Sequence, residues 1–146
     1  MKKIIVMILS VILCFGLVAC GGGGDNGEQA EAEPAKPLDL TGDWEQTNKN
    51  SETDYMEATI SGETITINWV FEEDDTTALY WAGTYVAPTE PTEEYSWTSE
   101  NDASQTDTAL MASTSATKEF TYQNGVLSFE ASALGVTTTV EMEMVE

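Results

Sequence analysis

The chain has 146 residues and a formal net charge of −21, with 26 Asp and Glu, five Lys, and neither Arg nor His. A surface this acidic repels phosphate backbones, so we expect no nucleic-acid partner. The missing residue types also exclude histidine catalysis, histidine ligation of metals and arginine clamps for anions.

The first 19 residues have the layout of a secretory signal peptide. Lys2 and Lys3 form a short positive start, and an almost wholly apolar stretch follows over residues 4–18. This stretch is too short, and ends too abruptly, for a membrane span. We therefore predict that residues 1–19 are removed from the mature protein.

The apolar stretch ends in Leu17-Val18-Ala19-Cys20. This motif resembles the lipobox of bacterial lipoproteins, in which the cysteine is acylated and becomes the first residue of the mature chain. The resemblance implies stable anchoring through Cys20, because two or more acyl chains hold a protein at a membrane. Since Cys14 would leave with the signal peptide, no disulfide or thiol nucleophile is expected to remain. An ordinary signal peptide with a chance cysteine is the alternative.

The mature chain divides into a tether and one domain. Residues 20–37 comprise the lipidated cysteine and a segment rich in Gly, Pro and acidic residues. That segment has no apolar side chain larger than Ala, so we expect it to be disordered. Residues 38–146 have the length of a single small domain, which can bury a core without cross-links.

Apolar and polar residues alternate through this domain, as is typical of half-buried strands. The clearest case is residues 64–71, and Ser61-Gly62 and Asn124-Gly125 carry the signals of hairpin turns. Further strands are expected around Trp44 and over residues 56–60, 79–85, 95–99, 120–122, 127–131 and 136–144.

About eight strands, with no helical period between them, predict an all-β antiparallel meander. Closure removes the exposed edges of such a sheet, so we expect a small closed or nearly closed, lipocalin-like barrel, with a β-sandwich as the alternative. Residues 87–94 contain two prolines and are predicted to form a loop. Residues 100–117 are largely polar, and 109–112 are expected to form a short strand or one helical turn.

Two resemblances extend this interpretation. The start Leu40-Thr41-Gly42-Asp43-Trp44 resembles the Gly-x-Trp start of lipocalin-like barrels, in which the Trp closes the barrel floor; the Arg that commonly packs across it is missing here. A second resemblance covers most of the domain and implies a surface lipoprotein, without implying an activity. It is to a group of small bacterial lipoproteins of no established function, through LYWAGTYVAPT (79–89), YSWTS (95–99), KEFTY (118–122) and SALG (132–135).

Carboxylates are the only abundant ionisable groups. Glu72-Glu73-Asp74-Asp75 and Glu93-Glu94 contain the groups needed for an acid/base pair or a calcium site. However, they fall in predicted loop tips, nothing indicates their burial, and no Asp-x-Asp-x-Asp-Gly loop is present. We therefore predict solvated acidic turns, no catalytic residue, no metal and no cofactor, and hence a protein that is not an enzyme.

Four tryptophans are present in the domain. Trp44, Trp69 and Trp81 are expected to fill the interior of a barrel that has room for side chains or one small ligand. Little space for a cargo would remain.

The other aromatics are candidates for ligand contact. Tyr80 has the opposite strand parity to Trp81, so one of the two is predicted to face outward. Tyr95 and Trp97 lie beside the proline loop, near a predicted mouth or edge of the barrel. Exposed aromatics rimmed by acids suit contact with a carbohydrate or a protein, whereas packing in the core is the alternative. The candidate ligand-binding residues are Tyr80, Tyr95 and Trp97.

Together these features predict a monomeric, non-enzymatic binding or interaction module, anchored through Cys20 on the extracytoplasmic face of the cell membrane. Its expected partner is a protein or a glycan of the cell envelope. A protein partner would be basic, and its binding would weaken as salt rises. The alternatives are a carrier of a small apolar ligand in the barrel interior and a surface exclusion or decoy factor.

Overall fold

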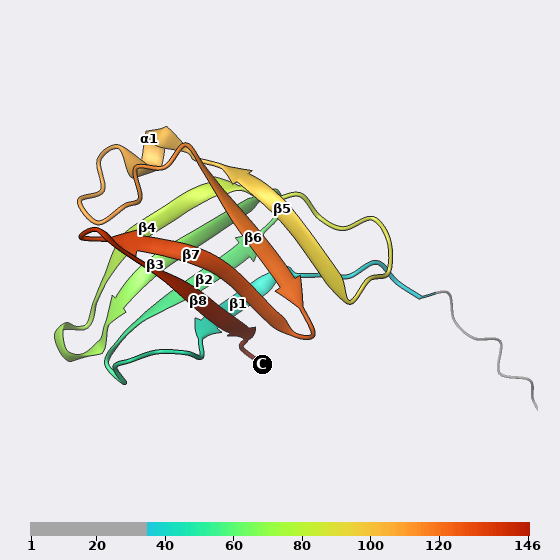
Figure 1. Cartoon of the computed structure of the whole chain (residues 1–146), viewed down its shortest axis with the longest axis horizontal. Helices are drawn as coiled ribbons and strands as arrows, with labels where there is room; N and C mark the ends of the chain where they lie inside the picture. The colour runs from blue at the N-terminus through green and yellow to red at the C-terminus, as the bar shows by residue number, and fades with distance from the viewer. Residues whose placement is uncertain (1–34) are drawn as a thin grey trace, which may run out of the picture. The chain divides into compact units, whose positions relative to one another are not determined.

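A computed structural model describes residues 35–146 (Figure 1). The predicted signal peptide, Cys20 and most of the tether lie outside the described residues. Within residues 35–146, no helix has the length and apolar character needed to cross a membrane. The elements are β1 (Gly42–Gln46), β2 (Asp54–Ser61), β3 (Thr64–Phe71), the 3-10 turn η1 (Glu72–Asp74), β4 (Thr76–Thr84), β5 (Glu94–Glu100), α1 (Ala103–Thr106), β6 (Thr117–Gln123), β7 (Val126–Ala133) and β8 (Val136–Met144).

All eight strands belong to one antiparallel sheet in the order β4-β3-β2-β1-β8-β7-β6-β5. The first and last strands pair with each other, so β4 and β5 are the edges. The sheet curls strongly into a barrel-like form that is not closed (Figure 1). The predicted all-β meander of about eight strands is confirmed. The structure has a single sheet rather than the two sheets of a sandwich, and the barrel is incomplete between β4 and β5.

The long polar connection contains one short helix, Ala103–Thr106, that the sequence did not predict. It begins after Asp102, whose side chain accepts a hydrogen bond from the backbone N–H of Ser104 at 3.1 Å and so caps the helix. Residues 109–112 form a single turn, in which the backbone N–H of Ala112 donates to the carbonyl of Ala109 at 3.2 Å.

The core occupies the concave side of the sheet and receives side chains from every strand. Trp44 and Trp81 are fully buried, as predicted. Trp69 is only half-buried and packs edge-on against Tyr80, with 5.7 Å between ring centroids. The main buried side chains are Leu40, Trp44, Met56, Ile60, Ile65, Ile67, Tyr80, Trp81, Tyr85, Trp97, Phe120, Leu127, Phe129, Val140 and Met142.

The expectation that Tyr80 or Trp81 faces outward is wrong. Both are buried, with only 1% of Tyr80 exposed. The pairing of β3 with β4 shifts between Ile67 and Asn68, because Ile67 lies opposite Trp81 whereas Asn68 lies opposite Leu79. Tyr80 is therefore the extra residue of a β-bulge, which breaks the alternation of faces. It is a core residue rather than an exposed contact.

Candidate functional site

Trp97 and Tyr95 connect the two edge strands instead of standing exposed. Trp97 is only 7% exposed, stacks on Phe120 at 4.9 Å, and donates an indole hydrogen bond to the carbonyl of Thr84 at 3.3 Å. Tyr95 is half-buried, and its hydroxyl donates to the carbonyl of Val86 at 2.8 Å. Of the two interpretations left open for these side chains, the structure contains core packing: Trp97 belongs to the core cluster and Tyr95 packs against it.

Further contacts extend this junction, which we call the β4–β5 seam. The indole of Trp81 donates to the hydroxyl of Ser99 at 3.0 Å, and one isolated bridge pairs Gly83 with Asn101. Beyond the bridge, the connection after β5 covers the edge of β4. There the carbonyls of Tyr80 and Ala82 accept hydrogen bonds from the backbone N–H groups of Ser113 and Asp102, both at 2.8 Å. These bonds satisfy edge groups that a closed barrel would pair.

Whereas the side chains of the β4–β5 seam are packed together, one end of the barrel carries exposed apolar side chains. We call this end the mouth. It is formed by the loop 47–53, the acidic tip 72–75, the connection 101–116 and the turn 134–135. These segments lie on the left of Figure 1. The described chain begins at the other end of the domain, where residues 35–41 lead into β1.

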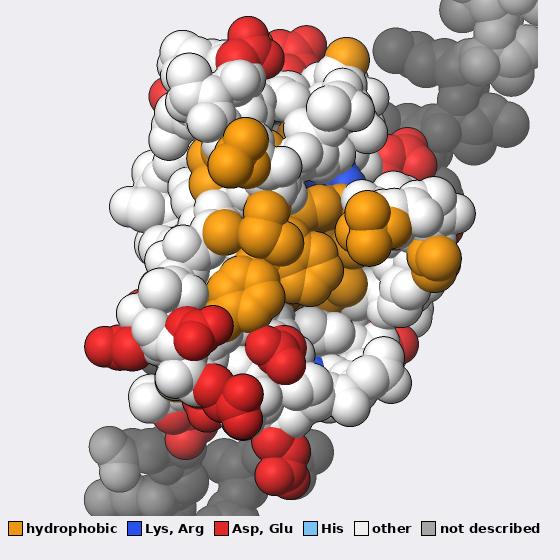
Figure 2. All heavy atoms as spheres, turned by 90° about the vertical axis from the view of Figure 1, so that its left-hand side faces the viewer, with side chains coloured by type: hydrophobic (Ala, Val, Ile, Leu, Met, Phe, Trp, Pro, Cys, Tyr) orange, Lys and Arg blue, Asp and Glu red, His pale blue; other side chains and the backbone are white. Residues whose placement is uncertain are grey.

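Hydrophobic side chains gather on the face that includes the mouth, as Figure 2 shows. Four of the seven exposed large apolar side chains in residues 35–146 belong to its segments: Leu110 and Met111 in the connection, Leu134 in the turn, and Val136 directly after it. At the same end of the barrel, a pocket of about 280 Å³ has Val136 and the half-buried Trp69 in its lining. We call these five residues the mouth patch.

Leu134 occupies a strained position at the tip of this patch. Its φ is +52° and that of Gly135 is +81°, the left-handed pair that a type I′ hairpin turn requires. The other such turn in the domain has Asn124 and Gly125 at φ +52° and +92°. A leucine in this conformation costs about 1 kcal/mol, whereas Asn adopts it readily. The side chain of Leu134 is nevertheless fully exposed, so no burial compensates for the strain.

An acidic rim adjoins the mouth patch. Glu72, Glu73, Asp74 and Asp75 are all exposed, as predicted for a solvated turn. Figure 2 shows acidic side chains gathered along one side of the hydrophobic surface. Within the part of the chain that the structure describes, no group of three or more acidic or cysteine side chains is arranged to hold a metal ion.

One side chain of the rim also has a structural role. The hydroxyl of Tyr55 donates to the carboxylate of Glu72 at 2.9 Å. This hydrogen bond, with a smaller effect from burial, raises the pKa of Tyr55 to about 12. Lys49 lies 4.1 Å from the centre of the Tyr55 ring and forms an ion pair with Glu45 at 2.7 Å. These contacts attach the acidic tip to β2 and to the loop that follows β1.

Comparison with known proteins finds no matching family model, no similar curated protein and no similar solved structure. The chain contains a barrel-like antiparallel domain with a filled interior, and its exposed apolar surface is concentrated beside an acidic rim at one end. The sequence analysis named Tyr80, Tyr95 and Trp97 as candidate ligand-binding residues and did not single out this end of the barrel.

Proposed function

We propose that this protein is a lipid-anchored, extracytoplasmic binding module whose mouth patch docks a basic partner segment carrying apolar side chains. The observation that carries the proposal is Leu134, a fully exposed apolar residue in a backbone conformation that disfavours it. Strain without a structural benefit is typical of functional positions. The apolar patch provides contact area, and the acidic rim favours a basic partner.

The place where the chain enters the domain is consistent with this proposal. If Cys20 is lipidated, residues 21–37 form a spacer that reaches roughly 20–25 Å as a flexible coil. Residues 35–41, which lead into β1, lie at the end of the domain opposite the mouth (Figure 1). An anchor at Cys20 would therefore attach the domain by that end rather than by the mouth.

A carrier of an apolar ligand has less support. The centre of the barrel is occupied by large side chains, among them Trp44, Trp81 and Phe120. The pocket at the mouth has about 280 Å³, and typical small-molecule sites have about 300–1,000 Å³. The mouth therefore suits the side chains of a docked segment better than an enclosed ligand.

Replacing Leu134 by Asn tests the proposal through two readouts. We expect the free energy of unfolding to rise by about 0.5–1 kcal/mol, because Asn relieves the left-handed strain. We also expect weaker binding of a designed Lys/Leu amphipathic peptide, because the variant removes an apolar contact. Urea unfolding measures the first effect and isothermal calorimetry the second.

The matched control is Val86→Asn, which changes an exposed apolar residue at the opposite end of the barrel. Val86 is 58% exposed, and we expect its replacement to leave peptide binding unchanged. Equal peptide affinity in the wild type and the Leu134→Asn variant would contradict docking at the mouth.

A further inference from the structure

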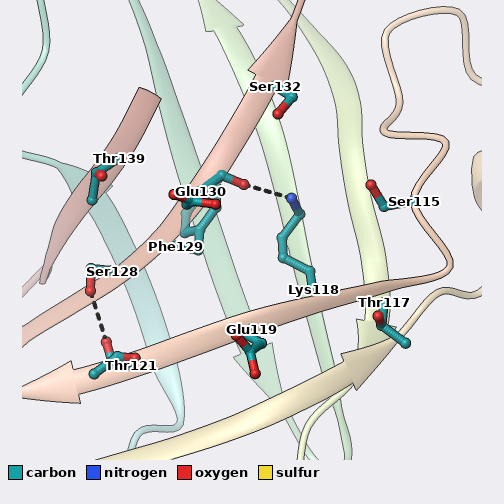
Figure 3. A pocket seen from close by; sticks show the side chains of 10 residues that line it. All are labelled: Ser115, Thr117, Lys118, Glu119, Thr121, Ser128, Phe129, Glu130, Ser132 and Thr139. Carbon is teal, nitrogen blue, oxygen red and sulfur yellow. Dashed lines mark hydrogen bonds between the residues drawn. The ribbon is translucent and has the colours of Figure 1, made fainter. Parts of the chain in front are cut away.

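A second site lies where the sheet divides between β6 and β7. The ladder of these two strands runs only from the pair Gln123–Val126 to the pair Phe120–Phe129. Beyond it, residues 117–119 pair with β5 alone, and residues 130–133 pair with β8 alone. Figure 3 shows the two strands separating, with Lys118 extending across the gap between them. We call this gap the fork.

Two side chains satisfy backbone groups that the missing ladder leaves without a strand partner. Lys118 Nζ donates to the carbonyl of Glu130 at 2.7 Å and to the hydroxyl of Tyr80 at 3.2 Å. The same hydroxyl accepts the backbone N–H of Ser132 at 3.0 Å. Lys118 is only 8% exposed, so its ammonium group is held in a fixed position at the base of the fork.

The ammonium group of Lys118 is stabilised without a counter-ion. It lies 5.0 Å from the ring centre of Tyr80, 5.3 Å from that of Trp81 and 5.7 Å from that of Phe129. Aromatic faces at such distances attract a cation. In residues 35–146, no carboxylate lies within 4.0 Å of it. Its contacts with the described residues use two of its three N–H donors, so one donor remains for a ligand.

The fork contains a pocket of about 350 Å³ that opens to solvent. Hydroxyl groups of Ser115, Thr117 and Ser132 lie around Lys118, and the carboxylates of Glu119 and Glu130 belong to the same lining (Figure 3). The wall therefore combines hydrogen-bond donors with acceptors. Its volume is at the lower end of the range for small-molecule sites, which suits one ring-sized ligand.

The surrounding charge selects among polar ligands. Residues 38–146 contain 22 Asp and Glu against Lys49 and Lys118, so the field of the domain repels an anion. Glu119 and Glu130 repel it again at the pocket. A hydroxyl group of a neutral ligand both donates and accepts hydrogen bonds. Such a ligand can therefore bond to the ammonium, hydroxyl and carboxylate groups of this lining at the same time.

We infer that the fork binds a neutral polyhydroxylated ligand, such as one sugar ring of a glycan, with the free N–H of Lys118 donating to a ligand oxygen. This site shares no lining residue with the pocket at the mouth. The two pockets are therefore distinct, although Ser115 of the fork lies in the connection 101–116 that also borders the mouth.

Nuclear magnetic resonance of the full chain labelled with ¹⁵N tests the inference. The probes are glucose, N-acetylglucosamine and their β-linked disaccharides, with glucuronate and inorganic phosphate as anionic comparators. We expect at least one neutral sugar to shift the Lys118 ammonium and the Thr117 and Ser132 amide signals saturably. The anions should produce no such shift.

Variants then assign the effect to the fork. Lys118→Met retains the apolar stem but should weaken sugar binding about tenfold, the effect of losing a hydrogen bond from a charged donor. Ser115→Ala removes an exposed hydroxyl of the lining and should weaken binding severalfold. The matched control is Ser96→Ala on the exposed face of β5, which should bind as the wild type does.

Three results would overturn the inference: no saturable shift with any of the neutral sugars, binding of the anions alone, or unchanged sugar binding in Lys118→Met. If Lys118→Met fails to fold, Ser115→Ala decides. Its side chain is exposed in the connection before β6, so the fold does not depend on it. If Ser115→Ala then bound the sugar as tightly as Ser96→Ala does, the proposed site would be excluded.

Discussion

Replacing Trp97 by Ala is expected to lower the free energy of unfolding by about 3–5 kcal/mol, the usual cost of removing a large buried aromatic side chain. The indole stacks on Phe120 and Tyr95, meets Tyr85 edge-on at 5.1 Å and donates to the carbonyl of Thr84. Its loss leaves a cavity and separates β5 from β4. For a small domain, this cost is a large part of the total stability.

Urea unfolding monitored by circular dichroism measures the effect of Trp97→Ala. Trp97→Phe retains an aromatic ring but loses the hydrogen bond, and should cost clearly less. Val86→Ala, at an exposed position near the seam, should change stability by no more than about 0.5 kcal/mol. A cost below about 1 kcal/mol for Trp97→Ala would show that the indole does not hold the edge strands together.

Replacing Gly83 by Ala is expected to destabilise the domain by about 2–3 kcal/mol, because it overpacks the β4–β5 seam. A Cβ at this position would lie 2.5 Å from the carbonyl oxygen of Glu100 and 2.7 Å from Nε1 of Trp81. It would also clash with the hydroxyl of Ser99. The Glu100 oxygen is backbone, so the bridge between Gly83 and Asn101 would have to open. Near-ultraviolet circular dichroism should report altered packing of Trp81.

Gly62→Ala provides a control that separates space from backbone conformation. Gly62 has φ +60° and open surroundings, so its replacement should cost about 1 kcal/mol from backbone strain alone. If urea unfolding gave equal costs for the two variants, the steric explanation for Gly83 would be wrong.

The strands were predictable because alternation of apolar and polar residues reports directly on the two faces of a sheet. Residues 64–71 became β3, and Asn124-Gly125 forms the expected turn. The bulge at Tyr80 was not predictable in this way. It depends on the register against β3, a long-range property, and it reverses the face on which a side chain lies.

The burial of Trp97 depends on a long-range contact in the same way. Trp97 and Tyr95 lie beside a proline loop, which indicates exposure, but they cross from β5 to the carbonyls of Thr84 and Val86 because the barrel lacks a ladder there. The signals for the mouth were weaker and local. Leu110 lies within a polar segment, and Leu134 precedes a glycine at a position where a hairpin turn favours Asn.

Trp69 provides the most direct measurement of the central claim, which is that the mouth binds a basic, partly apolar segment. It is the half-buried tryptophan of the mouth patch, whereas Trp44, Trp81 and Trp97 are at most 7% exposed. A fluorescence titration with the Lys/Leu peptide should give a saturable change that is lost in Trp69→Phe. Because the acidic rim attracts a basic peptide, binding should weaken as salt rises. A change that persists in Trp69→Phe, or binding that is insensitive to salt, would contradict docking at the mouth.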